Sequence, residues 1–130
     1  MKKIRVVCAV IQDRKRLLTF RRGSQSAHAG LWEFPGGKVK LGETLDEALH
    51  REIWEELMIK IKISKQLPPV VHQYDTFRIH LFPFLCSIEK GVIHLTEHDA
   101  YQWVDLQEAQ MLDWSAADVA IWKAYFKSTF

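Results

Sequence analysis

The chain has 130 residues and a formal net charge of +2, from 18 Lys and Arg against 16 Asp and Glu. Hydrophobic residues make up 48% of it and charged residues of both signs 26%, which is typical of one globular domain with its own core. This composition excludes a collagen, a coiled coil and a disulfide-stapled scaffold, and it lacks the concentrated basic charge of a duplex-binding protein. We therefore interpret residues 1–130 as a single domain with no stable nucleic acid partner.

The cysteines and the apolar runs indicate where the protein resides. Cys8 and Cys86 lie in separate apolar runs without the spacing of metal ligands, which predicts buried, reduced thiols. The apolar run at residues 81–86 is far shorter than the roughly 20 residues that a membrane helix needs. The basic N-terminus continues into Arg5 and is followed by no small-residue cleavage site. These features predict a cytoplasmic protein with no membrane partner.

The first thirty residues read as two strands and a loop. Residues 4–11 are rich in Val and Ile, as in a buried strand, and residues 12–16 form a polar turn. A second strand is expected at residues 17–22. The stretch 23–30 is small, polar and bounded by glycines, which is typical of a loop.

The next segment predicts a break followed by the main helix. Residues 35–37 are Pro-Gly-Gly, and we expect them to interrupt regular structure. From Thr44 to about Met58 the pattern is helical, and Glu47 stands three residues after Thr44 as in a capping box. No Gly or Pro interrupts this helix.

The second half returns to strands and then to helices. Strands are expected at residues 59–64, 70–74 and 77–88, with Pro83 indicating an edge strand or a bulge. A short strand at 101–104 precedes a brief helix from residue 105 and a final helix from Ser115. Strands outnumber helices, so we predict an α/β fold with a mixed sheet flanked by two or three helices.

Three glutamates gather on one face of the main helix. At about 100° per residue, Glu52, Glu55 and Glu56 lie within one arc of about 100°. They repel one another by ~0.2–0.5 kcal/mol per close pair, and only Arg51 lies nearby to compensate. Hard divalent cations require this kind of convergence of carboxylate oxygens. A solvated acidic face is the alternative.

The surroundings favour a site over a solvated face. Leu49, Ile53 and Leu57 form an adjacent apolar stripe by which the helix docks, so the carboxylates lie at the edge of the core. Arg51 is placed to pair with Glu43 and to tie the preceding loop to the helix.

Two further features point to phosphate chemistry. Gly36 and Gly37 allow the backbone to approach a phosphate or a metal closely, and Arg21 and Arg22 provide cations upstream. Together with the glutamates they predict metal-assisted chemistry on a phosphate ester, in which metals neutralise the phosphate and activate water.

These residues resemble the signature of the Nudix hydrolase family. That signature is a glycine, five residues, a glutamate, seven residues, and then Arg-Glu-aliphatic-any-Glu-Glu-any-Gly-aliphatic. The matching positions in this chain are Gly37, Glu43, Arg51, Glu52, Ile53, Glu55, Glu56 and Ile59. Met58 replaces the signature glycine, which would normally supply a left-handed end to the helix. We therefore expect the helix to end differently, with some loss of local stability and little effect on chemistry.

The resemblance extends over nearly the whole chain. The segment LWEFPGGK at residues 31–38 is similar to the MutT-type branch, which includes pyrophosphohydrolases of oxidised-guanine and pyrimidine nucleoside triphosphates. The tail of the chain is similar to the cytidine-nucleotide subgroup. The resemblance implies a Nudix α/β/α sandwich with a mixed β-sheet, Mg²⁺ (with Mn²⁺ as the alternative) as cofactor, and a monomer or homodimer.

The resemblance also implies roles for individual residues. Glu52 matches the general base and is also a candidate metal ligand, and Glu55 and Glu56 match metal-ligating glutamates with further catalytic roles. The carbonyl of Gly36 and the carboxylate of Glu97 match further metal ligands, and Arg22 matches a phosphate-contacting residue. Asp118 matches a residue that reads the edge of the nucleobase, and weaker candidates for the base pocket are Phe34 and Phe77 or Arg78.

Several of these residues have simpler explanations. Glu97 can be a solvated loop residue, Asp118 a cap of the last helix and Arg22 the end of an edge strand. The six histidines show no ligand spacing and suit Mg²⁺ poorly, so we interpret them as surface or core residues. The tryptophans are expected mostly in the core.

The implied function is hydrolysis of nucleoside triphosphates to monophosphate and pyrophosphate, as in the sanitising of nucleotide pools that accompanies DNA repair. Oxidised-guanine and cytidine-type nucleotides both remain open as substrates. The alternatives are cleavage of another nucleoside diphosphate-linked substrate, a non-catalytic nucleotide-binding Nudix domain, and a single-strand nucleic-acid binder.

Overall fold

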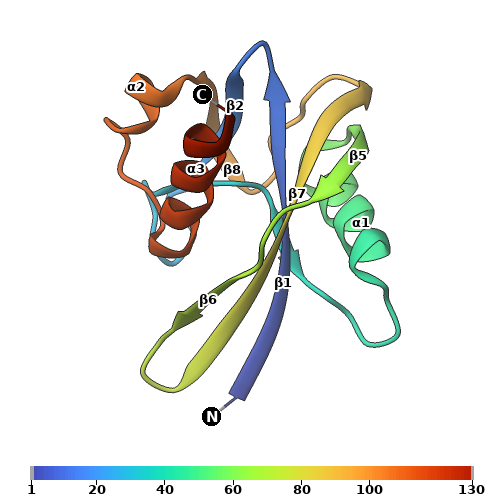
Figure 1. Ribbon diagram of the computed structural model, residues 1–130. Coiled ribbons are helices and arrows are strands. Elements are labelled where there is room, and N and C mark those ends of the chain that lie inside the picture. Colours follow the sequence, from blue (N-terminus) through green and yellow to red (C-terminus); the bar gives the residue numbers. More distant parts are fainter. Residues whose placement is uncertain (1, 130) are drawn as a thin grey trace.

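The computed structural model describes residues 2–129, which form a mixed sheet with helices on both faces (Figure 1). The strands are β1 (Lys2–Asp13), β2 (Arg16–Arg22), β3 (Trp32–Glu33), β4 (Gly36–Lys38), β5 (Lys60–Gln66), β6 (Val70–Gln73), β7 (Phe77–Lys90) and β8 (His98–Val104). The helices are α1 (Leu45–Leu57), α2 (Leu106–Ala109) and α3 (Ala116–Thr129). The predicted α/β class and mixed sheet are confirmed.

The parallel pair of β1 and β7 is the centre of the fold. The sheet runs in the order β3-β2-β1-β7-β5, with β4 on β1, β6 on β7 and β8 on β2, and every pairing except that of β1 with β7 is antiparallel. Val7 and Ala9 of β1 pack in the core cluster that contains α1. Cys8 and Val10 pack in the cluster that contains α3. Because neighbouring residues of a strand point to opposite faces, β1 is covered on both sides, which gives the α/β/α sandwich.

The predicted break at residues 35–37 is wrong in part. Gly36–Lys38 form β4, a short strand that pairs with residues 6–8 of β1. Glycines at 36 and 37 usually signal a turn, but here they are strand residues packed closely against other backbone and side-chain atoms. That close packing leaves no space for side chains at these two positions.

The prediction that Pro83 marks an edge strand or a bulge is also wrong, because β7 is central and its register with β1 runs unbroken through Pro83. One side of β7 pairs with β1, and the other pairs with β6 as far as Leu81 and with β5 from Phe84. The Pro83 carbonyl accepts from the N–H of Leu67 in the β5–β6 connection. Pro83 thus lies where the neighbour changes from β6 to β5, and its missing N–H interrupts neither ladder.

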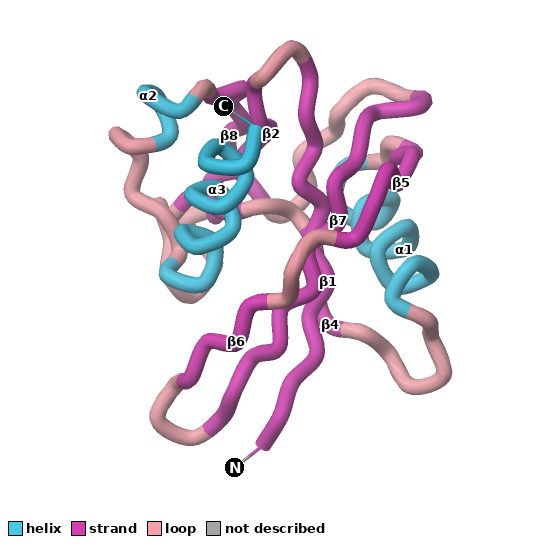
Figure 2. Tube along the Cα trace, viewed as in Figure 1, coloured by secondary structure: helices cyan, strands magenta, loops and turns pink. Residues whose placement is uncertain are grey.

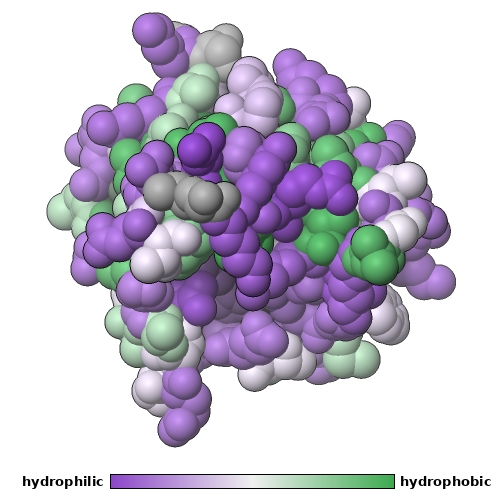
Figure 3. Space-filling model, turned by 90° about the horizontal axis from the view of Figure 1, so that it is seen from below, coloured by the Kyte–Doolittle hydropathy of each residue, from purple (hydrophilic) through white to green (hydrophobic). Residues whose placement is uncertain are grey.

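The surface is mostly hydrophilic on the face seen from below, with hydrophobic side chains in separate places (Figure 3). Trp114 and Trp122 are buried, and Trp32 and Trp103 pack against the core, so the expectation that the tryptophans lie mostly in the core is confirmed. Trp54 on α1 is the exception, with 55% of its surface exposed. Cys8 and Cys86 are buried free thiols, as predicted. In residues 2–129 no helix is long and apolar enough to cross a membrane.

Both ends of α1 follow from its sequence. Thr44 is the N-cap, and its hydroxyl accepts from the N–H of Glu47, whose carboxylate accepts from the N–H of Thr44, so the predicted capping box is confirmed. Met58 is the C-cap and adopts the left-handed conformation, with φ 58° and ψ 34°. This conformation normally favours glycine.

Replacing Met58 by glycine should stabilise the protein. The Met58→Gly variant removes a left-handed penalty of about 1 kcal/mol and loses little packing because Met58 is 45% exposed. We expect the free energy of unfolding in urea to rise by about that amount. The Met58→Ala variant keeps the Cβ atom and is the control; an equal gain in that variant would contradict this explanation.

Candidate active site

Arg51 connects α1 to the loop before it and to β4. Its Nε and Nη2 donate to Glu43 at 2.6 and 2.9 Å, and Nη2 also donates to the Lys38 carbonyl at 3.1 Å. Its Nη1 donates to Glu52 at 2.8 Å and to Glu55 at 3.3 Å. The predicted pairing with Glu43 is confirmed, and it lowers the pKa of Glu43 to about 2. One guanidinium thus offsets the repulsion among several signature carboxylates.

The two glycines of β4 allow α1 to approach the sheet. A Cβ atom at Gly37 would overlap the carboxylate of Glu52, and one at Gly36 would overlap the backbone of Val7. The N–H of Gly36 donates to the carboxylate of Glu56. The glycines therefore place two glutamates of the helix directly against a strand backbone.

A polar cavity of about 900 Å³ lies beside this contact. The cavity lining includes both glycines of β4 and five charged residues from distant parts of the sequence. These charged residues are Arg22, Glu33, Glu52, Glu56 and Glu97. Glu55 is not among its lining residues, and its side chain is 52% exposed. The structure thus brings six of the predicted residues together with Glu33, namely Arg22, Gly36, Gly37, Glu52, Glu56 and Glu97.

Glu56 is the buried member of the carboxylate group. It is 6% exposed, and its Oε2 has no hydrogen-bond partner among the described residues. Burial, followed by the charges of Glu97, Glu52 and Glu33, raises the pKa of Glu56 to about 9. A buried carboxylate with one unpartnered oxygen and like charges around it fits a hard divalent cation. The side chains as they stand in residues 2–129 do not already form a cluster of three such ligands.

A second buried acid, Asp118, lies in the first turn of α3. It is 6% exposed. Burial and the charge of Glu33 raise its pKa well above the usual range, while a hydrogen bond from the N–H of Phe34 and the charge of Arg22 oppose this shift. Phe34 is 3% exposed and packs on Trp114 with ring centroids 5.2 Å apart. The charge of Glu33 acts on both Glu56 and Asp118, so Glu33 lies near both acids.

Phe34, Asp118 and Arg78 are not among the residues that line the cavity, and Arg78 lies on a separate part of the sheet. It is exposed on β7, paired in register with Lys3 of β1 and Gln73 of β6. Figure 2 shows this end of β7 in the arm that projects with β6 and the N-terminal part of β1. Neighbouring Phe77 stacks on Tyr74 at the end of the hairpin, at 4.8 Å. The structure does not bring Arg78 into the cavity lining.

Sequence reasoning missed Glu33 and His98. Glu33 accepts from Arg22 Nη1 at 2.8 Å and faces His98 Nε2 at 2.9 Å. The only sequence signal was the charged residue within WEF at residues 32–34, and the partner histidine lies 65 positions away.

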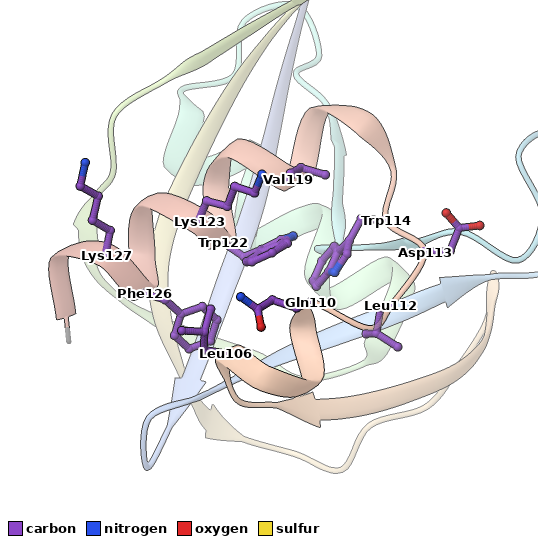
Figure 4. Close-up of a pocket in the computed structure, with 10 residues that line it drawn as sticks. All are labelled: Leu106, Gln110, Leu112, Asp113, Trp114, Val119, Trp122, Lys123, Phe126 and Lys127. Atoms are coloured by element: carbon purple, nitrogen blue, oxygen red, sulfur yellow. The ribbon is translucent and has the colours of Figure 1, made fainter.

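A larger hollow, of about 990 Å³, lies between α2 and α3 (Figure 4). Trp114, Trp122 and Phe126 supply apolar walls, and Lys123 and Lys127 lie along the α3 side. None of the signature carboxylates lines it. The cavity beside β4 is therefore the site that the sequence motif marks.

Comparison with known proteins agrees with this geometry. A family model described as the NUDIX domain matches residues 1–126. The protein is a Nudix hydrolase.

Relatives place this Nudix hydrolase in the MutT type. It is similar to a CTP pyrophosphohydrolase of Escherichia coli, with 34% identity over 96% of this chain and 93% of the relative. It is 32% identical to an 8-oxo-dGTP diphosphatase of Buchnera aphidicola over 83% of this chain and 82% of the relative. Among solved structures, the ORF135 protein of E. coli matches with a TM-score of 0.84 and 33% identity, covering 98% of this chain and 91% of that one. A MutT protein of Methanosarcina mazei matches with a TM-score of 0.81 and 29% identity, covering 98% and 92%.

The raised pKa of Glu56 predicts a pH-dependent stability. Because the folded-state pKa of about 9 exceeds the ordinary 4.5, the contribution of Glu56 to stability is complete below pH 4.5 and is lost as pH rises toward 9. Without metal, Glu56→Gln should therefore melt above the wild type near pH 8, and the difference should shrink toward pH 5. A divalent cation near pH 8 should raise the melting temperature of the wild type more than that of the variant. A variant that melts below the wild type near pH 8 without metal would contradict this assignment.

Proposed function

We propose that this Nudix hydrolase cleaves nucleoside triphosphates to nucleoside monophosphate and pyrophosphate, with cytidine-type or oxidised-guanine nucleotides as substrates. The observation that carries the proposal is the grouping of Glu52, Glu56, Glu97 and Arg22 around one cavity beside Gly36 and Gly37. Such a donor set suits a divalent cation together with a phosphate chain. The names of the relatives, a CTP pyrophosphohydrolase and an 8-oxo-dGTP diphosphatase, support the substrate class.

In this proposal the acidic end of the cavity handles the reacting phosphate. Nudix hydrolases use divalent metal ions, and a bound cation neutralises phosphate oxygens and makes water more acidic. Glu52, Glu56, Glu97 and the Gly36 carbonyl are the groups that would hold it, with Glu55 at the exposed rim. Mg²⁺ is the expected ion, and Mn²⁺ is the alternative.

Glu52 is the proposed general base. It takes a proton from water, the water oxygen forms a bond to a phosphorus of the triphosphate chain, and the anhydride bond on the far side breaks. Pyrophosphate leaves with the electron pair of that bond. Arg51 holds the carboxylate of Glu52 at 2.8 Å, and contact with Gly37 fixes its position. Arg22 would bind phosphate oxygens.

The apolar end of the site would receive the base. Phe34 would supply an aromatic wall there, and Asp118 a carboxyl group whose raised pKa favours the protonated form, although both are buried and neither lines the cavity itself. A protonated acid can donate to a carbonyl and accept from an exocyclic amine. Cytosine, guanine and oxidised guanine each present both groups on one edge, so this carboxyl group is compatible with all three bases.

The test is pyrophosphate release with Mg²⁺ from a panel of canonical and oxidised nucleoside triphosphates. We expect one base to be preferred, and we expect Glu52→Gln to lower kcat by about 100-fold or more because the base is lost. Glu89→Gln makes the same chemical change on an exposed residue of β7 and should leave kcat unchanged. Absence of turnover on every triphosphate by folded, metal-supplemented protein would falsify the proposal.

A further inference from the structure

A chain of polar contacts crosses three strands behind the phosphate end of the cavity. His98 at the start of β8 contacts Glu33 of β3 through Nε2 at 2.9 Å. Glu33 accepts from Nη1 of Arg22, at the end of β2, at 2.8 Å. Arg22 and His98 are also register partners across a β-bulge between β2 and β8. All three line the cavity.

The direction of the hydrogen bonds follows from the groups themselves. The Glu33 carboxylate only accepts, so Nε2 of His98 carries the proton and donates. The His98 side chain is 3% exposed and its ring lies 5.3 Å from that of Phe20. Its other nitrogen, Nδ1, is buried without a partner among the described residues. An imidazole in this position is costly to bury, and its contact with Glu33 is its one polar compensation within residues 2–129.

Arg22 is held on two sides and keeps one donor group free. Its Nε donates to the hydroxyl of Ser26 at 2.8 Å and to the Ala27 carbonyl at 3.1 Å, and Nη1 is taken by Glu33. Within residues 2–129, Nη2 has no hydrogen-bond partner. A carboxylate and a guanidinium, if unrestrained, prefer to pair through two parallel bonds, which would consume Nη2 as well.

We propose that His98 is a positioning residue that keeps Arg22 available to phosphate. By occupying Oε2 of Glu33, His98 restricts Glu33 to a single bond with Nη1 and leaves Nη2 for the phosphate chain of the substrate. Without His98, Glu33 turns and binds both Nη1 and Nη2. This inference rests on the proposed role of Arg22 in the hydrolysis of nucleoside triphosphates.

The test compares two substitutions of His98. In His98→Leu the volume is similar and the donor is lost, whereas in His98→Gln an amide N–H lies near the position of Nε2. We expect His98→Leu to raise KM for the preferred triphosphate by about tenfold, the loss of one charge-assisted hydrogen bond, with kcat within about threefold. His98→Gln should recover most of the affinity. Equal KM values in the wild type and His98→Leu would overturn the inference.

A second background separates positioning from core packing. In a Glu33→Ala protein there is no carboxylate to restrain, so adding His98→Leu should leave KM unchanged. If His98 only fills the core, the change in KM will be the same in both backgrounds, will follow the melting temperature and will not be rescued by His98→Gln. That result would contradict the proposal.

Binding of inorganic pyrophosphate with Mg²⁺, measured by calorimetry, makes the inference testable apart from turnover. If the wild type hydrolyses no triphosphate, the proposed function fails. In that case weaker pyrophosphate binding in His98→Leu, restored in His98→Gln, still supports the positioning role. Equal binding in the wild type and both variants, or no binding by the wild type, overturns it.

Discussion

The guanidinium of Arg51 is the interaction on which the site depends. It reaches the Lys38 carbonyl, Glu43, Glu52 and Glu55 at once. A helix with glutamates at i, i+3 and i+4 concentrates negative charge on one face, and this single cation offsets part of that charge. The same residue fastens the long loop between β4 and α1, which Figure 2 shows as the connection into the helix. Arg51 therefore stabilises the fold of the loop and also positions the glutamates of the site.

Different surroundings give the glutamates of α1 different properties. Glu52 is paired with Arg51, whereas Glu56, one turn along, is buried without a cationic partner and has a pKa raised to about 9. Separating carboxylates by environment is a general way to assign different roles to similar groups. A divalent cation is the missing charge that would stabilise the buried carboxylate as an anion. Asp118 is a second buried acid near Glu33 with a raised pKa, and it lies on the side where we propose that the nucleobase binds.

The sequence predicted what depends on local pattern. The capping box, the docking stripe of α1 and the Arg51–Glu43 pair all lie within one short segment, so spacing alone revealed them. One local expectation was wrong: the helix does not end differently at Met58, because this residue itself adopts the left-handed conformation that the signature glycine would supply. The roles of the site residues stay predictions.

What the sequence did not reveal depends on distant partners. β4 was taken for a break because Pro-Gly-Gly is a turn signal, and only the pairing with β1 makes it a strand. Pro83 was taken to mark an edge strand or a bulge because proline has no N–H for a sheet ladder. Its strand instead has two successive neighbours on one side, which no local pattern shows. His98 and Glu33 meet across 65 positions, and neither belongs to a periodic pattern.

The central claim is that the carboxylates beside Gly36 and Gly37 hold a cation next to the phosphates of a nucleotide. The most direct test is a crystal structure with Mn²⁺ and a non-hydrolysable nucleoside triphosphate, with manganese located by anomalous scattering. The account predicts manganese bound to Glu56 with Glu52 or Glu97, and phosphate oxygens at Nη2 of Arg22. Manganese bound elsewhere, with the triphosphate outside this cavity, would contradict it.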